Sequence, residues 1–357
     1  MLREGKAIRF FMFILFVTPI WMVSCRSSEP KLADEITFYG WGGENEIEGL
    51  FDGFEEEYGV KVIYQEYDSL IEAVDSVRNG NVYDVVSMEN QYVPQMIEEG
   101  LLAELDKANI PNFKNISPNF RDLSYDPSNR YTIPYSFGTT GIVVRTDLAA
   151  REVTSWSDLW ADDFAGKVAM WEGTPRYTVA AALMALGYSI NSENREEVRK
   201  AVDILIDAKP NIYWLNEELS SAPVLVAGDV EIALGWSLDV WEAGESVRTV
   251  DYVIPKEGSI LWGDNFVIPA NSPNKYTAEL FLDYVMRPEK AALITNWTYY
   301  PMANEASYPF VDPVILEDPI SFPTNEEVRN AELLLPLSQE GQKMFEAEWA
   351  RFLAATP

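Results

Sequence analysis

Three short segments of the sequence place a tryptophan close to a carboxylate. Carboxylates make strong, short hydrogen bonds to ammonium groups, and indole faces attract cations by about 0.5–2 kcal/mol. Flat aromatic surfaces also suit methylene chains. The pattern therefore favours a binding site for an alkyl diamine or polyamine. The segments are "MWEG" with Trp171 and Glu172, "GWSLDVW" with Trp236 and Asp239, and "LWGDN" with Trp262 and Asp264.

The third segment predicts the most specific geometry. In "ILWGDNFVIPAN", Trp262 and Asp264 are two residues apart, and in an extended chain such positions point the same way. An indole and a carboxylate would thus lie side by side. Other roles are open for each residue alone, because a tryptophan at a strand end often packs at an edge. Asp239 in particular could cap the first turn of a following helix.

The composition excludes several classes of site. The chain has 357 residues, long enough for two lobes, with 57 acidic and 27 basic side chains and a net charge of −30. This charge argues against a nucleic-acid partner and would steer cations toward the protein. The sequence has no histidine, which removes Ser-His triads and His-ligated metals. Its single cysteine, Cys25, cannot form an intrachain disulfide.

The first 25 residues have the pattern of a targeting segment. A basic head with Arg3, Lys6 and Arg9 precedes an apolar run from Phe10 to Val23, as in secretory signals. The run is short for a membrane span. "MVSC" is similar to the lipobox of bacterial lipoproteins, in which the cysteine is lipidated. We therefore predict a lipoprotein signal peptide over 1–24 and a lipidated tether over 25–34.

The rest of the chain alternates strand-like and helix-like segments, which predicts an α/β fold with a parallel sheet. Ligands of such sheets bind at the carboxyl ends of strands, where Trp41, Trp171 and Trp236 are expected. A single helix is expected over 275–297. Two long extended stretches, 131–147 and 252–271, flank the middle α/β set and indicate a chain that leaves one lobe, builds a second and returns. A cleft between lobes commonly binds a small ligand.

A series of motifs in order resembles the spermidine/putrescine-binding proteins of bacterial ABC importers, over residues 35–357. The resemblance implies a two-lobed type II periplasmic-binding-protein (venus flytrap) fold that closes around one polyamine. It implies lobe 1 over 35–140 and 263–308, and lobe 2 over 146–257 and 314–357. The motifs are "FYGW", "YGVKVIY", "IPYSFGTTGI", "VTSWSDLW", "GWSLDVW", "NFVIPAN", "RPEKA" and "YYPMAN".

The resemblance also implies a set of ligand contacts, with Asp239 matching an aspartate of the putrescine-preferring branch. Some positions depart from the family pattern, among them Gly42, Gly43 and Leu334. Further contacts are expected at several positions that also differ from it. The expected polyamine-binding residues are Trp41, Trp236, Asp239, Trp262, Asp264 and Tyr300, and the further candidates are Glu44, Glu89, Gln91, Glu172 and Tyr177.

The resulting hypothesis is a membrane-anchored, extracytoplasmic or periplasmic lipoprotein that captures putrescine or spermidine and delivers it to the permease subunits of an ABC transporter. We expect a monomer without enzymatic activity, cofactor or metal, and with no nucleic-acid partner. Delivery to a sensor is an open alternative. A second alternative is that the protein binds another small cation, or a ferric ion through Tyr299 and Tyr300. A third is that it is a carboxylate-dependent glycoside hydrolase.

Overall fold

The computed structural model describes residues 30–215, 220–323, 327 and 330–356. The predicted signal peptide and the lipidation site Cys25 lie outside these residues. Leu32–Pro357 form one compact unit, separate from Met1–Lys31. In the described part of the chain, no helix is both long and apolar enough to cross a membrane.

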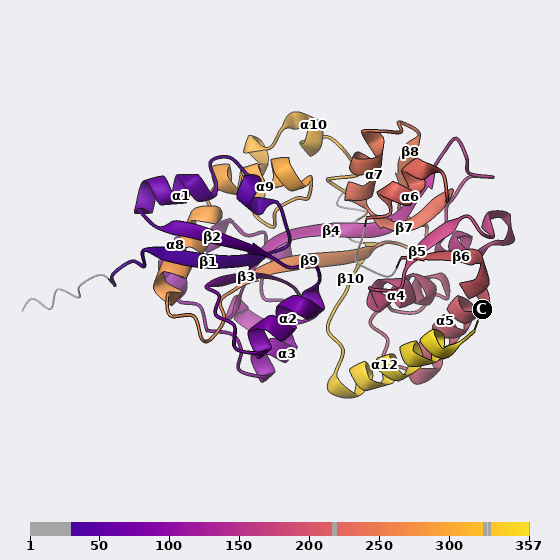
Figure 1. Cartoon of the computed structure of the whole chain (residues 1–357), viewed down its shortest axis with the longest axis horizontal. Helices are drawn as coiled ribbons and strands as arrows, with labels where there is room; N and C mark the ends of the chain where they lie inside the picture. Colours follow the sequence, from indigo (N-terminus) through magenta and orange to yellow (C-terminus); the bar gives the residue numbers. More distant parts are fainter. Residues whose placement is uncertain (1–29, 216–219, 324–326, 328–329, 357) are drawn as a thin grey trace, which may run out of the picture. The chain divides into compact units, whose positions relative to one another are not determined.

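The strands of this unit join in one ten-stranded sheet (Figure 1). Eight of them follow the order β2-β1-β3-β9-β4-β7-β5-β6, while β8 pairs with β4 and β10 pairs with β9. The strands are β1 (Glu35–Gly40), β2 (Lys61–Glu66), β3 (Val85–Glu89), β4 (Thr132–Arg145), β5 (Val168–Trp171), β6 (Ile212–Leu215), β7 (Ile232–Trp236), β8 (Val250–Val253), β9 (Ile260–Val267) and β10 (Glu332–Leu333).

The two strands β4 and β9 run through both halves of the unit (Figure 1). The first residues of β4, from Thr132, pair with β9, and its last part, Thr140 to Val144, pairs with β7. At its far end β9 also pairs antiparallel with β3. The sheet is therefore divided into a lobe built on β1–β3 and a lobe built on β5–β7. The extended stretches expected over 131–147 and 252–271 correspond to β4 and to β8 and β9.

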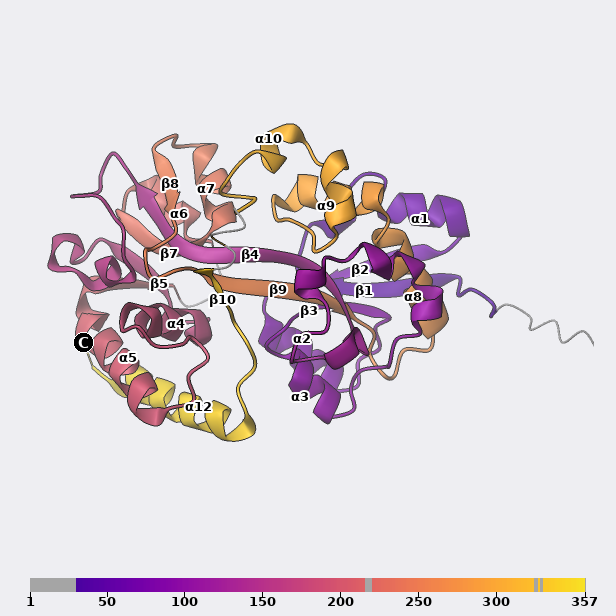
Figure 2. The same ribbon diagram turned by 180° about the vertical axis from the view of Figure 1, so that it is seen from behind.

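Helices cover the sheet in each lobe (Figures 1 and 2). Helix α1 buries Phe51 and Phe54, and it is capped by Gly59, whose φ of 68° favours glycine. Helix α4 begins with Pro175 in its first turn. The helices are α1 (Phe51–Tyr58), α2 (Leu70–Arg78), α3 (Val93–Glu98), α4 (Pro175–Ala185), α5 (Arg195–Ala208), α6 (Ala222–Ala227), α7 (Ser237–Gly244), α8 (Lys275–Val285), α9 (Pro288–Thr298), α10 (Pro313–Leu316) and α12 (Gln339–Ala354).

Two details differ from the expectation. The helix expected over 275–297 is two helices, α8 and α9, because Arg287 adopts an extended ψ of 139° before Pro288, as residues preceding proline tend to do. The first strand ends at Gly40 rather than at Trp41. Trp41 is therefore free of the strand ladder and stands in the loop that follows.

Each lobe has its own apolar core. Phe38, Phe54 and Phe281 belong to a core under β1, whereas Trp156 and Trp171 belong to a separate core in the other lobe. Some core residues also line the pocket, among them Trp262 and Tyr177 of one core and Tyr135 of the other.

Candidate ligand-binding site

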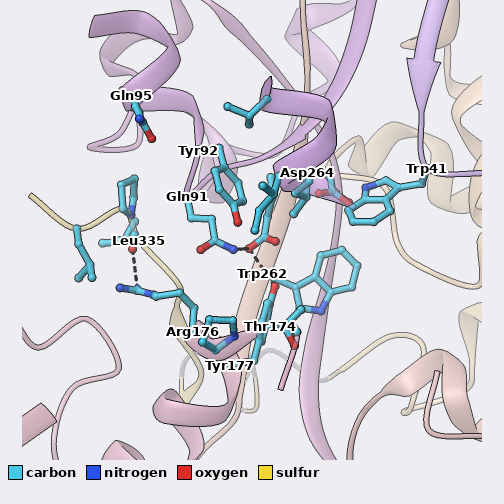
Figure 3. A pocket seen from close by; sticks show the side chains of 18 of the residues that line it. Trp41, Gln91, Tyr92, Gln95, Thr174, Arg176, Tyr177, Trp262, Asp264 and Leu335 are labelled. Atoms are coloured by element: carbon cyan, nitrogen blue, oxygen red, sulfur yellow. Dashed lines mark hydrogen bonds between the residues drawn. The ribbon is translucent and has the colours of Figure 1, made fainter. Parts of the chain in front are cut away.

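A pocket of about 1430 Å³ lies within the compact unit and is lined by residues of both lobes. Figure 3 shows Trp41 on one side of it and Arg176 with Leu335 on the opposite side. Most of the expected contacts meet here, whereas Asp239 and Glu172 are not among the lining residues. The expected residues that line the pocket are Trp41, Glu44, Glu89, Gln91, Tyr177, Trp236, Trp262, Asp264 and Tyr300.

Strand β9 positions Trp262 and Asp264 as the spacing predicts. Both side chains line the pocket, and both are buried, with 7% and 9% of their surfaces exposed. Gly138 of β4 lies directly across from Trp262 in the sheet. A Cβ atom at Gly138 would come within 2.3 Å of the Trp262 ring, so glycine at this position makes room for the indole.

Asp264 has a second carboxylate as its neighbour on β3. Glu89 and Asp264 are direct partners in the antiparallel ladder, so their side chains lie side by side. The Glu89 Oε1 atom accepts hydrogen bonds from Gln91 Nε2 and from the hydroxyl of Tyr177, each at 2.9 Å. Burial raises the pKa of Glu89 to about 7, because a charged carboxylate is poorly solvated there.

Glu44 adds a third buried carboxylate to the pocket. It lies in the short 3₁₀ helix Glu44–Glu46, and it accepts hydrogen bonds from the hydroxyls of Tyr64 and Tyr135 and from the backbone N–H of Gly42. Burial raises its pKa to about 8. A bound cation would favour the charged forms of Glu44 and Glu89, so the site is suited to positively charged ligands.

Aromatic rings form the remaining walls. Trp236 stacks on Trp171 with 4.3 Å between the ring centroids, and the ring of Tyr177 meets it edge-on. Tyr300 meets Trp262 edge-on at 4.7 Å. These contacts fix the ring planes, and the exposed faces offer apolar surface for methylene groups as well as attraction for cations.

Asp239 is fixed by hydrogen bonds to residues near it in the fold. Its carboxylate accepts hydrogen bonds from Ser220 and from the backbone and hydroxyl of Ser221, and from the N–H of Trp236 at the start of α7. The bond from Trp236 is that of a helix-capping residue, and the bonds from Ser220 and Ser221 tie Asp239 to the segment before α6. Burial raises the pKa of Asp239 to about 6. Its role as a ligand contact remains a prediction, as does that of the half-buried Glu172.

Thr174, which precedes α4, and Arg176, in the first turn of α4, also line the pocket and were not predicted from the sequence. The Oγ1 atom of Thr174, the Nε1 atom of Trp262 and the Nε atom of Arg176 are buried without a hydrogen-bond partner among the described residues. Because Arg176 directly precedes the candidate Tyr177 in the sequence, its position could have indicated a charged group at the site.

The described residues contain no group of three or more Asp, Glu, Cys or His side chains arranged to hold a metal ion. The buried carboxylates Glu44, Glu89 and Asp264 are instead combined with tyrosine hydroxyls and indoles. This set of groups suits hydrogen-bonding cations such as alkylammonium groups.

Comparison with known proteins identifies the family. The model of the family described as "bacterial extracellular solute-binding protein" matches residues 49–324. The chain belongs to this family. This solute-binding protein is 33% identical over 299 residues to the spermidine/putrescine-binding periplasmic protein of Escherichia coli, with 83% of this chain and 85% of that protein covered.

Two further relatives agree with this assignment. The solute-binding protein is 30% identical to the putrescine-binding periplasmic protein PotF of Escherichia coli, over 76% of this chain and 78% of that protein. A solved structure of a putative spermidine/putrescine ABC transporter protein from Listeria monocytogenes superimposes with a TM-score of 0.81 at 28% identity, covering 91% of this chain and 100% of that chain. The recognised family and the two-lobed fold are thereby confirmed.

Proposed function

We propose that this protein is the substrate-binding component of an ABC importer and captures a polyamine, putrescine or spermidine, in the cleft between its lobes. The observation that carries the proposal is the pocket itself, in which Glu44, Glu89 and Asp264 lie among Trp41 and Trp262. Carboxylates hold ammonium groups, and indole faces cover the methylene chain between them. The relatives that match most of the chain are named for spermidine and putrescine.

The mechanism is binding with closure of the lobes, without covalent chemistry. The lobes are expected at 35–140 with 263–308 and at 146–257 with 314–357, joined by β4 and β9. A ligand that contacts both lobes favours the closed arrangement because it binds that arrangement more tightly. The closed form then docks on the permease subunits, which release the polyamine for transport.

The predicted lipobox at Cys25 complements this role. A lipid attached to Cys25 anchors the protein at the membrane outside the cytoplasm, where the tether up to residue 34 lets the binding unit reach the permease. We expect the binding unit to act as a monomer. Incorporation of labelled palmitate in a bacterial host, lost in Cys25→Ala, tests the anchor.

Isothermal titration of the chain from Arg26, which keeps the whole compact unit, tests the ligand class. We expect one-to-one binding of putrescine or spermidine, and no binding of lysine, whose carboxylate would face Asp264 and Glu89. If putrescine, spermidine and spermine all failed to bind, polyamines would be excluded as the ligand class, and the fold assignment would be unchanged.

A further inference from the structure

Arg176 is a positive charge built into the wall of the pocket. It lies in the first turn of α4, and its Nη2 atom donates to the carbonyl of Leu335 at 2.9 Å and to Asn191 Oδ1 at 3.4 Å. Its guanidinium lies over the ring of Phe345, 5.5 Å from the centroid. These contacts hold the cation in place from its own lobe, and Figure 3 shows it on the side of the pocket opposite Trp41.

Arg176 directly precedes Tyr177, whose hydroxyl donates to Glu89 at 2.9 Å, and both Arg176 and Glu89 line the pocket, so the charge of Arg176 acts on Glu89. Burial raises the pKa of Glu89, and the nearby guanidinium opposes that rise. Burial likewise lowers the pKa of Arg176 to about 10, and the carboxylate of Glu89 opposes that fall. Glu89 also accepts hydrogen bonds from Gln91 and Tyr177. The protein itself therefore supplies partners and a countercharge for this carboxylate.

In the pocket, carboxylates shielded from solvent therefore outnumber guanidinium groups. Glu44, Glu89 and Asp264 are buried, Arg176 is half-buried, and the other described charged residues that line the pocket are exposed to solvent. Water and salt screen exposed charges much more strongly than buried ones. When a ligand draws all three carboxyls into their charged forms, one guanidinium leaves two negative charges for the ligand to balance. The exposed charged residues are Asp75, Arg78, Glu98, Glu99, Glu242, Lys343 and Glu346.

We propose that Arg176 determines specificity by taking the place of a third ammonium beside Glu89, so that the pocket prefers a diamine to a triamine. This inference rests on the proposed polyamine-binding function. The neighbouring positions support it, since Thr174 before α4 and Tyr177 in α4 line the pocket with hydroxyls rather than carboxylates. A third ammonium on this side of the pocket would meet the guanidinium without a carboxylate of its own.

Titration calorimetry of the chain from Arg26 with putrescine and spermidine tests the inference. We expect the unmodified protein to bind putrescine at least about tenfold more tightly than spermidine, a difference well resolved by such titrations. In Arg176→Gln the ratio of the two dissociation constants should fall by about tenfold or more, because spermidine gains affinity. Arg176→Lys, which keeps the charge, should retain most of the preference.

The ratio separates specificity from a structural role of Arg176, because a general weakening of the pocket would lower both affinities together. Spermidine bound as tightly as putrescine by the unmodified protein would overturn the inference without any variant. An unchanged ratio in Arg176→Gln would overturn it as well. If neither amine bound the unmodified protein, the proposed function itself would fail, and this outcome is distinct from the first two.

Discussion

Three buried carboxylates, surrounded by indole and phenol rings, give this pocket its character at the scale of single residues. Asp264 is placed by β9 beside Trp262, and Glu89 is placed beside Asp264 by the pairing of β3 with β9. Glu44 comes from the short 3₁₀ helix after β1 and is held by Tyr64 and Tyr135. Neighbouring carboxylates repel each other, and a bound ammonium relieves this repulsion.

Asp264→Asn should weaken polyamine binding by about 1.5–3 kcal/mol, the range for a hydrogen bond to a charged group. The reason is that the amide keeps the shape of the side chain and loses its charge. Titration calorimetry measures the loss, and Asp207→Asn, at an exposed position of α5 outside the pocket, is the control. Equal affinities of Asp264→Asn and Asp207→Asn would mean that Asp264 does not hold an ammonium.

The buried carboxyls predict a pH dependence. Their pKa values are raised by burial to about 8 in Glu44 and about 7 in Glu89, so the unliganded protein is expected to lose stability as the pH rises through this range. Ammonium groups bind the charged carboxylates of Glu44 and Glu89 more tightly than the neutral carboxyl groups. Polyamine affinity should therefore increase from about pH 6 to about pH 8.5, with release of protons on binding near neutral pH.

Calorimetry in two buffers with different ionisation enthalpies measures these protons, and thermal unfolding without ligand measures the stability. Glu44→Gln and Glu89→Gln should each reduce the number of protons released. Binding that is independent of pH over this range would mean that neither carboxyl changes its protonation when the ligand binds.

At the scale of elements, local sequence patterns were sufficient to predict most strands and the common orientation of Trp262 and Asp264. Apolar runs and alternation depend only on neighbouring residues. The break between α8 and α9 was missed although Pro288 signals it. The position of Arg176 directly before Tyr177 is visible in the sequence, but its contact with Leu335, 159 residues away, is not. Asp239 was placed correctly at the start of a helix, where capping and ligand binding give the same local pattern.

The close approach of β4 to Trp262 gives a prediction about strand packing. Gly138→Ala should weaken polyamine binding by about tenfold or more, because its Cβ atom would lie 2.3 Å from the Trp262 ring and force it to move. Gly263→Ala on β9 is the matched control, since its Cβ atom would meet only the carbonyl of Ser136 at 3.8 Å.

Intrinsic tryptophan fluorescence reports whether the indole environment has changed in each variant, and calorimetry reports the affinity. A Gly138→Ala protein that binds as tightly as Gly263→Ala would show that the position of the Trp262 ring does not matter for the ligand.

At the scale of the whole binding unit, contacts between the lobes converge on the pocket. The hydroxyl of Tyr177 reaches Glu89 at 2.9 Å, and Asn90 donates to the carbonyl of Leu334 at 2.5 Å. Gln339 of α12 donates to Glu98 of α3 at 3.0 Å, and both residues also line the pocket. Since β4 and β9 are the long strands shared by both lobes, bending of these strands is the expected route of closure.

The net charge of −30 acts over longer distances than these contacts. It attracts polyvalent amines toward the protein before they reach the pocket, and salt weakens this attraction. The buried carboxylates of the cleft then select the ligand at short range.

A crystal structure of the protein with its preferred polyamine tests the central claim most directly. We predict one extended ligand in the cleft, with an ammonium group at Asp264, its methylene chain against Trp262, and contacts to Trp41 of one lobe and Trp236 of the other. A polyamine that touches only one lobe of a closed protein, or that binds away from Asp264, would contradict the account.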